Sequence, residues 1–318
     1  MFLVNFAVNY PLYFISKYME QLRKYTWLIE KIRMAGKISH KDLSDKWERA
    51  VDYSDGRPLH RATFNRWREA IYSQFGIMID CQRTGGYLYY ISNPEEIDDD
   101  RLKKWMLDSF AVGNTIGEHL SIKDRIVVDE IPSGRYHLTT IMEAMKENRV
   151  VSVTYRQFSN PCGYTFPVEP YCLKLFENRW YLLGRNNRGE IRIYGLDRLE
   201  AVEPTDERFR LPEDFSADAF FSTRYGVVIG YDEEPRRIVV RSNEEHKHYL
   251  LSLPLHHSQT LIEDCGVYAD FELYLVPTYD FIMKLLQAGS MIEVISPPEL
   301  RRTMKGWVSE MYELYKND

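Results

Sequence analysis

Two stretches of this 318-residue chain hold side chains that could bind a polyanion. In the first, Asn65 and Arg66 are of the types that form bidentate hydrogen bonds with adenine and guanine. Cations and hydroxyls around them would contact phosphates, which position a protein on a duplex without reading its sequence. The predicted DNA-binding set is Arg61, Thr63, Asn65, Arg66, Arg68 and Arg83.

The second stretch interleaves arginine with tyrosine between residues 155 and 198. Flat rings stack on bases at roughly 1–3 kcal/mol per base, and guanidinium groups neutralise phosphates. Strand alternation places Arg192 and Tyr194 on one face. Alternatively, Arg192 and Arg198 could pair with Glu190 or Asp197 and serve the fold alone. The predicted ligand-binding set is Tyr155, Arg156, Tyr171, Tyr181, Arg192, Tyr194 and Arg198.

The elements that would position the first set read as three helices and a hairpin. Apolar residues at helical spacing predict a helix over 20–35, and Ser39 is a suitable N-cap for a second helix. A third helix is predicted over 59–75, because four apolar side chains recur there at spacings of three and four. Two strands, 77–81 and 87–91, would follow as a wing. This order predicts a winged helix-turn-helix.

The second set falls in a region of short β-rich runs. Turn signals separate these runs, and five short strands in about 55 residues predict a small, highly bent barrel. After about residue 234 strands alternate with helices, which predicts a compact α/β module. The five predicted strands are 150–156, 171–176, 180–185, 190–194 and 199–202.

A family resemblance rests on two motifs. The Trp180-Tyr181-Leu182 triplet and the Arg-x-Tyr-x-Leu-Asp-Arg run over 192–198 resemble the WYL domain, and the run over 292–301 resembles the C-terminal extension of WYL regulators. The resemblance implies an Sm-like or SH3-like barrel with a basic and aromatic pocket, an oligonucleotide or nucleotide effector, and a homodimer. Gly195 departs from the family pattern, in which a polar or basic residue is frequent there.

Together these patterns predict a multidomain α+β chain. It would consist of an N-terminal winged helix-turn-helix, a central Sm/SH3-like β-barrel and a small C-terminal α/β domain. The predicted divisions are 1–18 as a disordered extension, 19–92 as the winged helix-turn-helix, 93–136 as a helical linker, 137–225 as the WYL barrel and 226–318 as the C-terminal domain.

Composition and motifs exclude several classes of protein. With 44% hydrophobic and 28% charged residues, the chain is neither largely disordered nor membrane-embedded. Residues 1–92 carry a net charge of +5 and the remainder −11, so a basic front precedes an acidic body. The motifs G-x-S-x-G, H-E-x-x-H, G-x-x-x-x-G-K-[ST] and G-x-G-x-x-G are absent. We therefore expect no enzyme and no cofactor.

Metal, disulfide and membrane sites are not expected either. The four cysteines form no C-x-x-C pair, which favours a reducing cytoplasm. On a helix His246 and His248 would point about 200° apart, so they would not bind one metal ion. The apolar residues 1–16 are too short and too interrupted to span a bilayer. Met19 is the expected natural start.

The sequence thus predicts a cytoplasmic, effector-responsive transcriptional regulator. The third helix would read a double-stranded DNA operator, the barrel would sense the effector, and a homodimer would couple the two. One alternative is a nucleic-acid-sensing adaptor in genome defence that binds single strands through the barrel. Another is an RNA-binding protein that works through the barrel alone.

Overall fold

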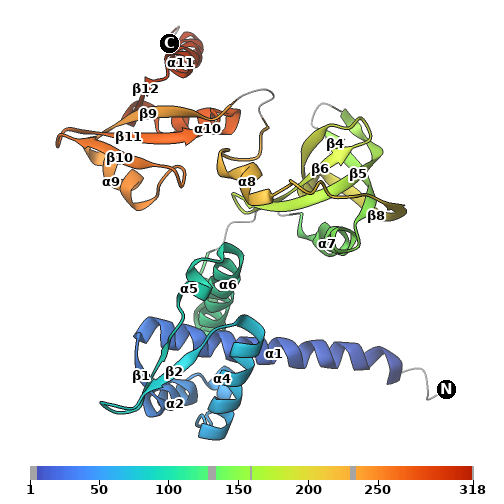
Figure 1. Ribbon diagram of the computed structural model, residues 1–318, viewed down its shortest axis with the longest axis vertical. Coiled ribbons are helices and arrows are strands. Elements are labelled where there is room, and N and C mark those ends of the chain that lie inside the picture. Colours follow the sequence, from blue (N-terminus) through green and yellow to red (C-terminus); the bar gives the residue numbers. More distant parts are fainter. Residues whose placement is uncertain (1–5, 128–133, 158–159, 230–233, 317–318) are drawn as a thin grey trace. The chain divides into compact units, whose positions relative to one another are not determined.

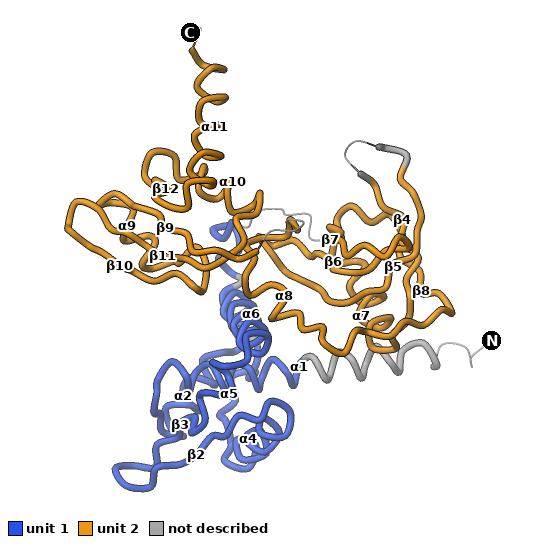
Figure 2. Tube along the Cα trace, turned by 45° about the horizontal axis from the view of Figure 1, so that its top comes forward, with its two compact units in different colours: residues 1–128 blue, residues 129–318 orange. Residues whose placement is uncertain are grey.

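The chain folds into two compact units, residues 1–128 and residues 129–318 (Figure 2). Both units combine helices with antiparallel sheets, as expected of a multidomain α+β chain. None of the described helices is both long and apolar enough to cross a membrane. The computed structural model describes residues 6–127, 134–157, 160–229 and 234–316.

The first unit packs its helices beside a three-stranded sheet of order β1-β3-β2 (Figure 1). Tryptophans from three helices share its core, because Trp47 packs edge-on against both Trp27, at 5.0 Å between ring centroids, and Trp67, at 5.1 Å. The elements of this unit are α1 (Phe6–Ala35), β1 (Ile38–Ser39), α2 (His40–Arg49), α3 (Val51–Ser54), α4 (Arg61–Phe75), β2 (Ile79–Gln82), β3 (Leu88–Ile91), α5 (Glu95–Asp98), α6 (Arg101–Gly117) and the 3-10 helix η1 (Leu120–Arg125).

Local signals explain where these helices begin and end. The Ser39 side chain caps α2 by accepting a hydrogen bond from the backbone N–H of Asp42. Gly76 ends α4 in the left-handed conformation, at φ +71°. The helix start expected near Met19 differs from the structure, in which α1 already begins at Phe6. Pro11 lies inside α1, although proline usually interrupts a helix.

In the second unit, residues 134–208 form a five-stranded antiparallel sheet of order β7-β6-β5-β4-β8. Ile141 and Ala144 of α7 are buried against this sheet (Figure 1). The central strand β5 is 17 residues long and begins at Asn160, whereas the sequence predicted a strand only from Tyr171. The elements are η2 (Arg135–His137), α7 (Leu138–Lys146), β4 (Arg149–Gln157), β5 (Asn160–Phe176), β6 (Arg179–Asn186), β7 (Ile191–Gly195), η3 (Leu196–Arg198) and β8 (Leu199–Arg208).

Residues 234–316 form a second module with its own core. Its antiparallel sheet has the order β10-β11-β9-β12, and the chain order β-α-β-β-α-β is the split βαβ arrangement. The sequence predicted the alternation of strands and helices but missed α9 and β10. The elements are β9 (Arg236–Asn243), α9 (Glu244–Ser252), β10 (Thr260–Asp264), β11 (Tyr268–Leu275), α10 (Tyr279–Gln287), η4 (Gly289–Met291), β12 (Ile292–Ser296) and α11 (Pro298–Tyr315).

A connecting segment follows α8 (Ala217–Ser222), and we call its residues 223–228 the strap. The strap is fixed to the C-terminal module by backbone hydrogen bonds, since the N–H of Val276 donates to Thr223 O at 2.8 Å. The Thr278 hydroxyl donates to Tyr225 O at 2.9 Å. The Asp280 carboxylate accepts the N–H groups of Val227 and Val228 at 2.6 and 2.9 Å.

Candidate nucleic-acid interface and ligand pocket

The outer face of α4 carries most of the first predicted set. Three buried side chains fix the inner face of this helix, so the residues opposite them face solvent. Arg61, Asn65 and Arg66 are exposed, as is Glu69, and Thr63 is half-buried. The helix therefore offers two cations and one amide on an accessible surface, with one carboxylate beside them.

Arg68 is placed differently from the other arginines of α4. It is half-buried, and its guanidinium donates to the carbonyl O of Ile79, through Nε at 2.9 Å and also through Nη2. The same group lies 5.2 Å from the ring centroid of Tyr89 and 5.7 Å from that of Phe64. These contacts tie α4 to β2 and β3, so Arg68 serves the packing of the hairpin against the helix.

Arg83 is exposed in the turn that joins β2 to β3. Gly85 and Gly86 follow it with φ values of +88° and +119°, which L side chains rarely adopt. Lys37 braces the base of this turn, since its Nζ donates to Gln82 Oε1 at 2.7 Å. Arg83 is thus the first residue after β2, in the exposed loop that closes the hairpin.

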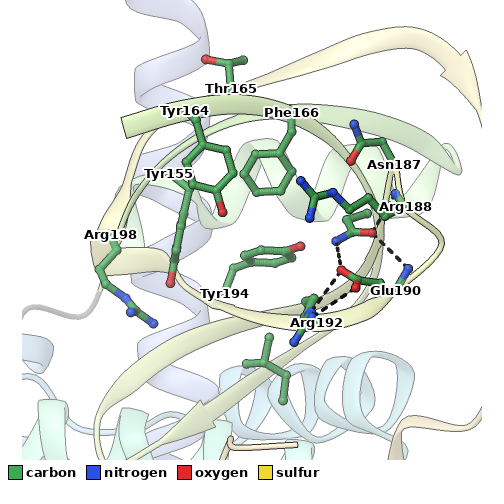
Figure 3. Close-up of a pocket in the computed structure, with 12 residues that line it drawn as sticks. Tyr155, Tyr164, Thr165, Phe166, Asn187, Arg188, Glu190, Arg192, Tyr194 and Arg198 are labelled. Carbon is green, nitrogen blue, oxygen red and sulfur yellow. Dashed lines mark hydrogen bonds and ion pairs between the residues drawn. The ribbon is translucent and has the colours of Figure 1, made fainter. Parts of the chain in front are cut away.

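A cavity of about 1000 Å³ opens on the sheet of residues 134–208 (Figure 3). It brings together four residues of the second predicted set, Tyr155, Arg192, Tyr194 and Arg198. The pocket also contains side chains that sequence reasoning missed. These are Tyr164, Thr165 and Phe166 of β5, Ile193 of β7, and Asn186, Asn187, Arg188 and Glu190 around the turn between β6 and β7.

Aromatic rings form the floor and one rim of the pocket. Tyr155 and Tyr194 pack edge-on, at 5.4 Å between ring centroids, and Phe166 lies 5.5 Å from Tyr194. These three side chains are under 10% exposed, whereas Tyr164, which stacks on Phe166 at 4.9 Å, is 41% exposed. Tyr164 is therefore the ring of this group that a planar ligand can reach.

The buried hydroxyls of the pocket are hydrogen-bond donors at neutral pH. Burial raises the pKa of Tyr194 to about 12 and also raises that of Tyr155, because the phenolate form loses its hydration. The floor therefore carries no negative charge of its own. This suits a ligand with phosphate groups.

Three guanidinium groups surround these rings. Arg198 lies over the Tyr155 ring, 5.0 Å from its centroid, and Arg188 is exposed in the β6–β7 turn. Arg192 pairs with Glu190, through Nη2 to Oε1 at 3.3 Å and Nε to Oε2 at 3.4 Å. Arg192 thus forms the ion pair with Glu190 that the sequence analysis offered as an alternative to ligand binding.

Gly195 gives Arg198 the space it occupies. A Cβ atom on Gly195 would lie 2.8 Å from Asp197 Oδ1 and 3.3 Å from Arg198 Nε. A side chain at this position would require Asp197 Oδ1 to move and the Arg198 guanidinium to shift by a few tenths of an ångström. The glycine that departs from the family pattern therefore leaves room for the Asp197 and Arg198 side chains.

Three members of the second predicted set lie outside the pocket. Arg156 is exposed and its Nε donates to Glu200 Oε1 at 2.8 Å. Tyr171 is buried between Phe209 and Phe215, at centroid distances of 5.9 and 5.2 Å. Tyr181 points to the opposite side of β6 from the core residue Leu182. Residue type alone did not separate these side chains from the pocket residues.

The sequence does contain a signal for Tyr164 and Phe166. These two aromatic residues are spaced by two, which is the period of side chains on one face of a strand. The predicted strands leave out residues 157–170, because Asn160-Pro161 is a turn signal. In the structure Pro167 pairs with Ser152 within the β4–β5 ladder. The strand therefore continues through the supposed loop.

Comparison with known protein families identifies the domain to which the five-stranded sheet belongs. Residues 136–204 match the family model of the WYL domain. The chain contains a WYL domain. This confirms the resemblance of the Trp180-Tyr181-Leu182 triplet, and the whole pocket, between Tyr155 and Arg198, lies inside the matched part of the WYL domain.

Other comparisons concern the whole chain. No curated protein matches it. Similar solved structures include proteasome accessory factor B/C (PafBC) of Arthrobacter aurescens, at 19% identity and a TM-score of 0.29, covering 76% of this chain and 39% of that chain. A CRISPR Cas-related protein is similar at 11% identity and a TM-score of 0.39, covering 80% of this chain and 72% of that chain. This chain spans 39% of the length of the PafBC chain.

The described residues include no group of three or more His, Cys, Asp or Glu side chains that could hold a metal ion. His246 and His248 lie on the helix α9. At about 100° per residue, their side chains diverge by about 200°. Their spacing therefore does not support a shared ion.

Proposed function

We propose that the chain is a DNA-binding transcriptional regulator whose WYL domain binds a nucleic-acid or nucleotide effector and thereby modulates operator binding. The observation that carries this proposal is the pocket, in which four aromatic rings meet three guanidinium groups. Rings and cations in one concave site suit a ligand made of bases and phosphates. The non-ionised hydroxyls of its floor support the same class of ligand.

The N-terminal unit supplies the DNA-binding part of the proposal. We assign it as a winged helix-turn-helix, in which α4 enters the major groove and the β2–β3 hairpin is the wing. Asn65 and Arg66 would read base edges, while Arg61, Thr63 and Arg83 would contact phosphates. The protein would act as a cytoplasmic homodimer without catalytic activity, with an Sm-like barrel as its sensor.

Regulation requires that the effector distinguish two states. A ligand that bound both arrangements of the DNA-binding units equally tightly would not shift the equilibrium between them. The effector would therefore bind one arrangement more tightly and thereby change the affinity for the operator.

Two groups of variants test the proposal. Selection of duplexes from a random library by the full-length protein should fail in Asn65→Ala/Arg66→Ala, whereas binding of a single-stranded octathymidylate should persist. Arg198→Ala should weaken octathymidylate binding and leave duplex selection intact. Ser309→Ala is a control, because Ser309 is an exposed residue on α11, outside the proposed DNA-binding helix and the pocket.

Two outcomes count against the proposal. If Arg192→Ala and Arg198→Ala leave every oligonucleotide and nucleotide affinity unchanged, the pocket assignment is wrong. If the wild-type protein binds single strands but selects no duplex, the nucleic-acid-sensing adaptor replaces the regulator.

A further inference from the structure

We propose that the WYL pocket selects guanine, with Glu190 accepting hydrogen bonds from the N1–H and N2–H groups of the base while Arg188 donates to its O6 and N7 atoms. This inference rests on the proposed function and deepens it. It starts from one anomaly, a carboxylate placed among the cations of a pocket suited to phosphates.

Glu190 is ionised, so it accepts hydrogen bonds and repels phosphate. The hydrogen bond from the Asn186 amide lowers the pKa of Glu190 most, and the charges of Arg192 and Arg188 lower it further. Asn186 Nδ2 donates to Oε2 at 2.9 Å, while the contacts of Arg192 are longer, at 3.3 and 3.4 Å. A carboxylate has about four lone-pair sites, of which Asn186 and Arg192 occupy three. Oε1 therefore keeps one site for a guanine donor, and the second donor would replace the long contact between Arg192 Nε and Oε2.

The Watson–Crick edges of the bases differ in what they offer this carboxylate. Guanine presents two adjacent donors, N1–H and N2–H. Adenine and cytosine present one donor beside an acceptor nitrogen, and thymine presents one donor between two carbonyl oxygens. Since acceptor atoms are repelled by an ionised carboxylate, guanine fits Glu190 best.

Arg188 supplies the complementary half of the site. It lies two residues before Glu190 in the same turn, and Figure 3 shows both side chains on one side of the pocket. No hydrogen bond or ion pair joins its guanidinium to another described residue. Arginine donating to O6 and N7 is the commonest specific contact to guanine. Arg188 as the donor and Glu190 as the acceptor therefore match the adjacent O6 and N1–H groups of guanine.

The rest of the pocket can hold the remainder of the nucleotide. Tyr164 is the accessible ring on which the base would stack. Arg198, on the opposite side of the pocket in Figure 3, is a cation away from Glu190 and would take the phosphate. The ligand class is thus a single strand or nucleotide that carries guanine.

Fluorescence anisotropy with three labelled DNA octamers tests this selection in the full-length protein. Each octamer is thymine except for one central base, which is guanine, hypoxanthine or adenine. We expect guanine to bind about tenfold more tightly than adenine. Hypoxanthine should bind at an intermediate level, because it lacks the N2 amino group. Glu190→Gln should remove the preference for guanine over hypoxanthine, and the control Glu200→Gln, outside the pocket, should keep it.

The outcomes separate this inference from the proposed function. Equal affinity for the three octamers, with weaker binding of all three by Arg198→Ala, overturns guanine selection and leaves the proposed function standing. A guanine preference that persists in Glu190→Gln overturns the role of Glu190. If no octamer binds, the proposed function fails and guanine selection fails with it.

Discussion

Lys174 of β5 donates a hydrogen bond from Nζ to the carbonyl O of Gly226, at 2.6 Å. Its ammonium also lies 4.0 Å from the ring centroid of Phe221. Because Asp280 of α10 accepts the next two N–H groups of the strap, one short segment is held by the WYL domain on one side and by the C-terminal module on the other. The strap therefore links β5 of the WYL domain to α10 of the C-terminal module through hydrogen bonds.

The protonation of Lys174 should make stability depend on pH. Burial lowers the pKa of Lys174 from 10.5 to about 8, so between these values the unfolded chain binds more protons than the folded one. Stability from this group therefore rises as pH increases through that window. We expect the melting temperature of wild type, relative to Lys174→Met, to rise from pH 8 to pH 10. The exposed control Lys305→Met should show no such trend, and a flat difference for Lys174→Met would contradict the prediction.

Gly226→Ala should release the strap. Gly226 has φ +78°, and a Cβ atom there would collide with the Asp280 carboxylate. Gly266→Ala is a matched control, because Gly266 has φ +91° but no atom within 4 Å of its would-be Cβ, so it should lose only about 1 kcal/mol of stability. Hydrogen exchange at Val227 and Val228 should speed up in Gly226→Ala alone. Equal exchange in both variants would mean that Asp280 does not hold the strap.

Arg68→Ala should act on stability, unlike its neighbours on α4. Removing its guanidinium leaves the Ile79 carbonyl without this donor and exposes the Phe64 and Tyr89 rings, at a cost of about 2 kcal/mol. Arg66→Ala, at an exposed position, should change stability by less than about 0.5 kcal/mol. Thermal or urea unfolding measures both variants. Similar unfolding midpoints for the two would show that Arg68 is dispensable to the hairpin.

Gly195→Ala should weaken ligand binding through Arg198. The added methyl group would press on Asp197 Oδ1 and shift the Arg198 guanidinium above the Tyr155 ring, so octathymidylate affinity should fall part of the way toward that of Arg198→Ala. If the two changes act through one group, the double variant should bind no more weakly than Arg198→Ala alone. A double-mutant cycle by anisotropy checks this, and additive losses would place the effect of Gly195 elsewhere.

Several helices and strands could be predicted from the sequence, because apolar residues recur in them periodically and glycines mark where they end. The buried stripe of α4 and Gly76 gave its limits to within two residues of the structure. The hairpin strands were placed equally well, since Gly85 and Gly86 mark their turn. The split βαβ module was only partly predicted, because all five residues of β10 are exposed and show no alternation.

The pocket was harder to predict because it depends on which face of each strand lies inward. Arg192 and Tyr194 were placed on one face by alternation, and both line the pocket. Tyr171 has the same chemistry as Tyr155, yet it is the extra residue of the β5 irregularity between Pro170 and Cys172, where the register with β6 shifts. One inserted residue reverses the faces of a strand. No pattern of residue types in the sequence reveals such a shift.

If α4 binds duplex DNA as proposed, the position of Arg68 should also limit how steeply the affinity for the duplex falls with salt concentration. Each phosphate neutralised on B-DNA contributes about 0.9 to the slope of log affinity against log salt concentration. With Arg68 engaged by the Ile79 carbonyl, α4 offers Arg61 and Arg66 as exposed arginines. Because Arg66 is assigned to base edges, the phosphate contact of Arg61 should give the helix a slope of about 1 per bound copy, rather than the slope of about 2 expected if Arg68 also bound a phosphate. An arginine that holds the hairpin in place displaces no condensed cation from the DNA.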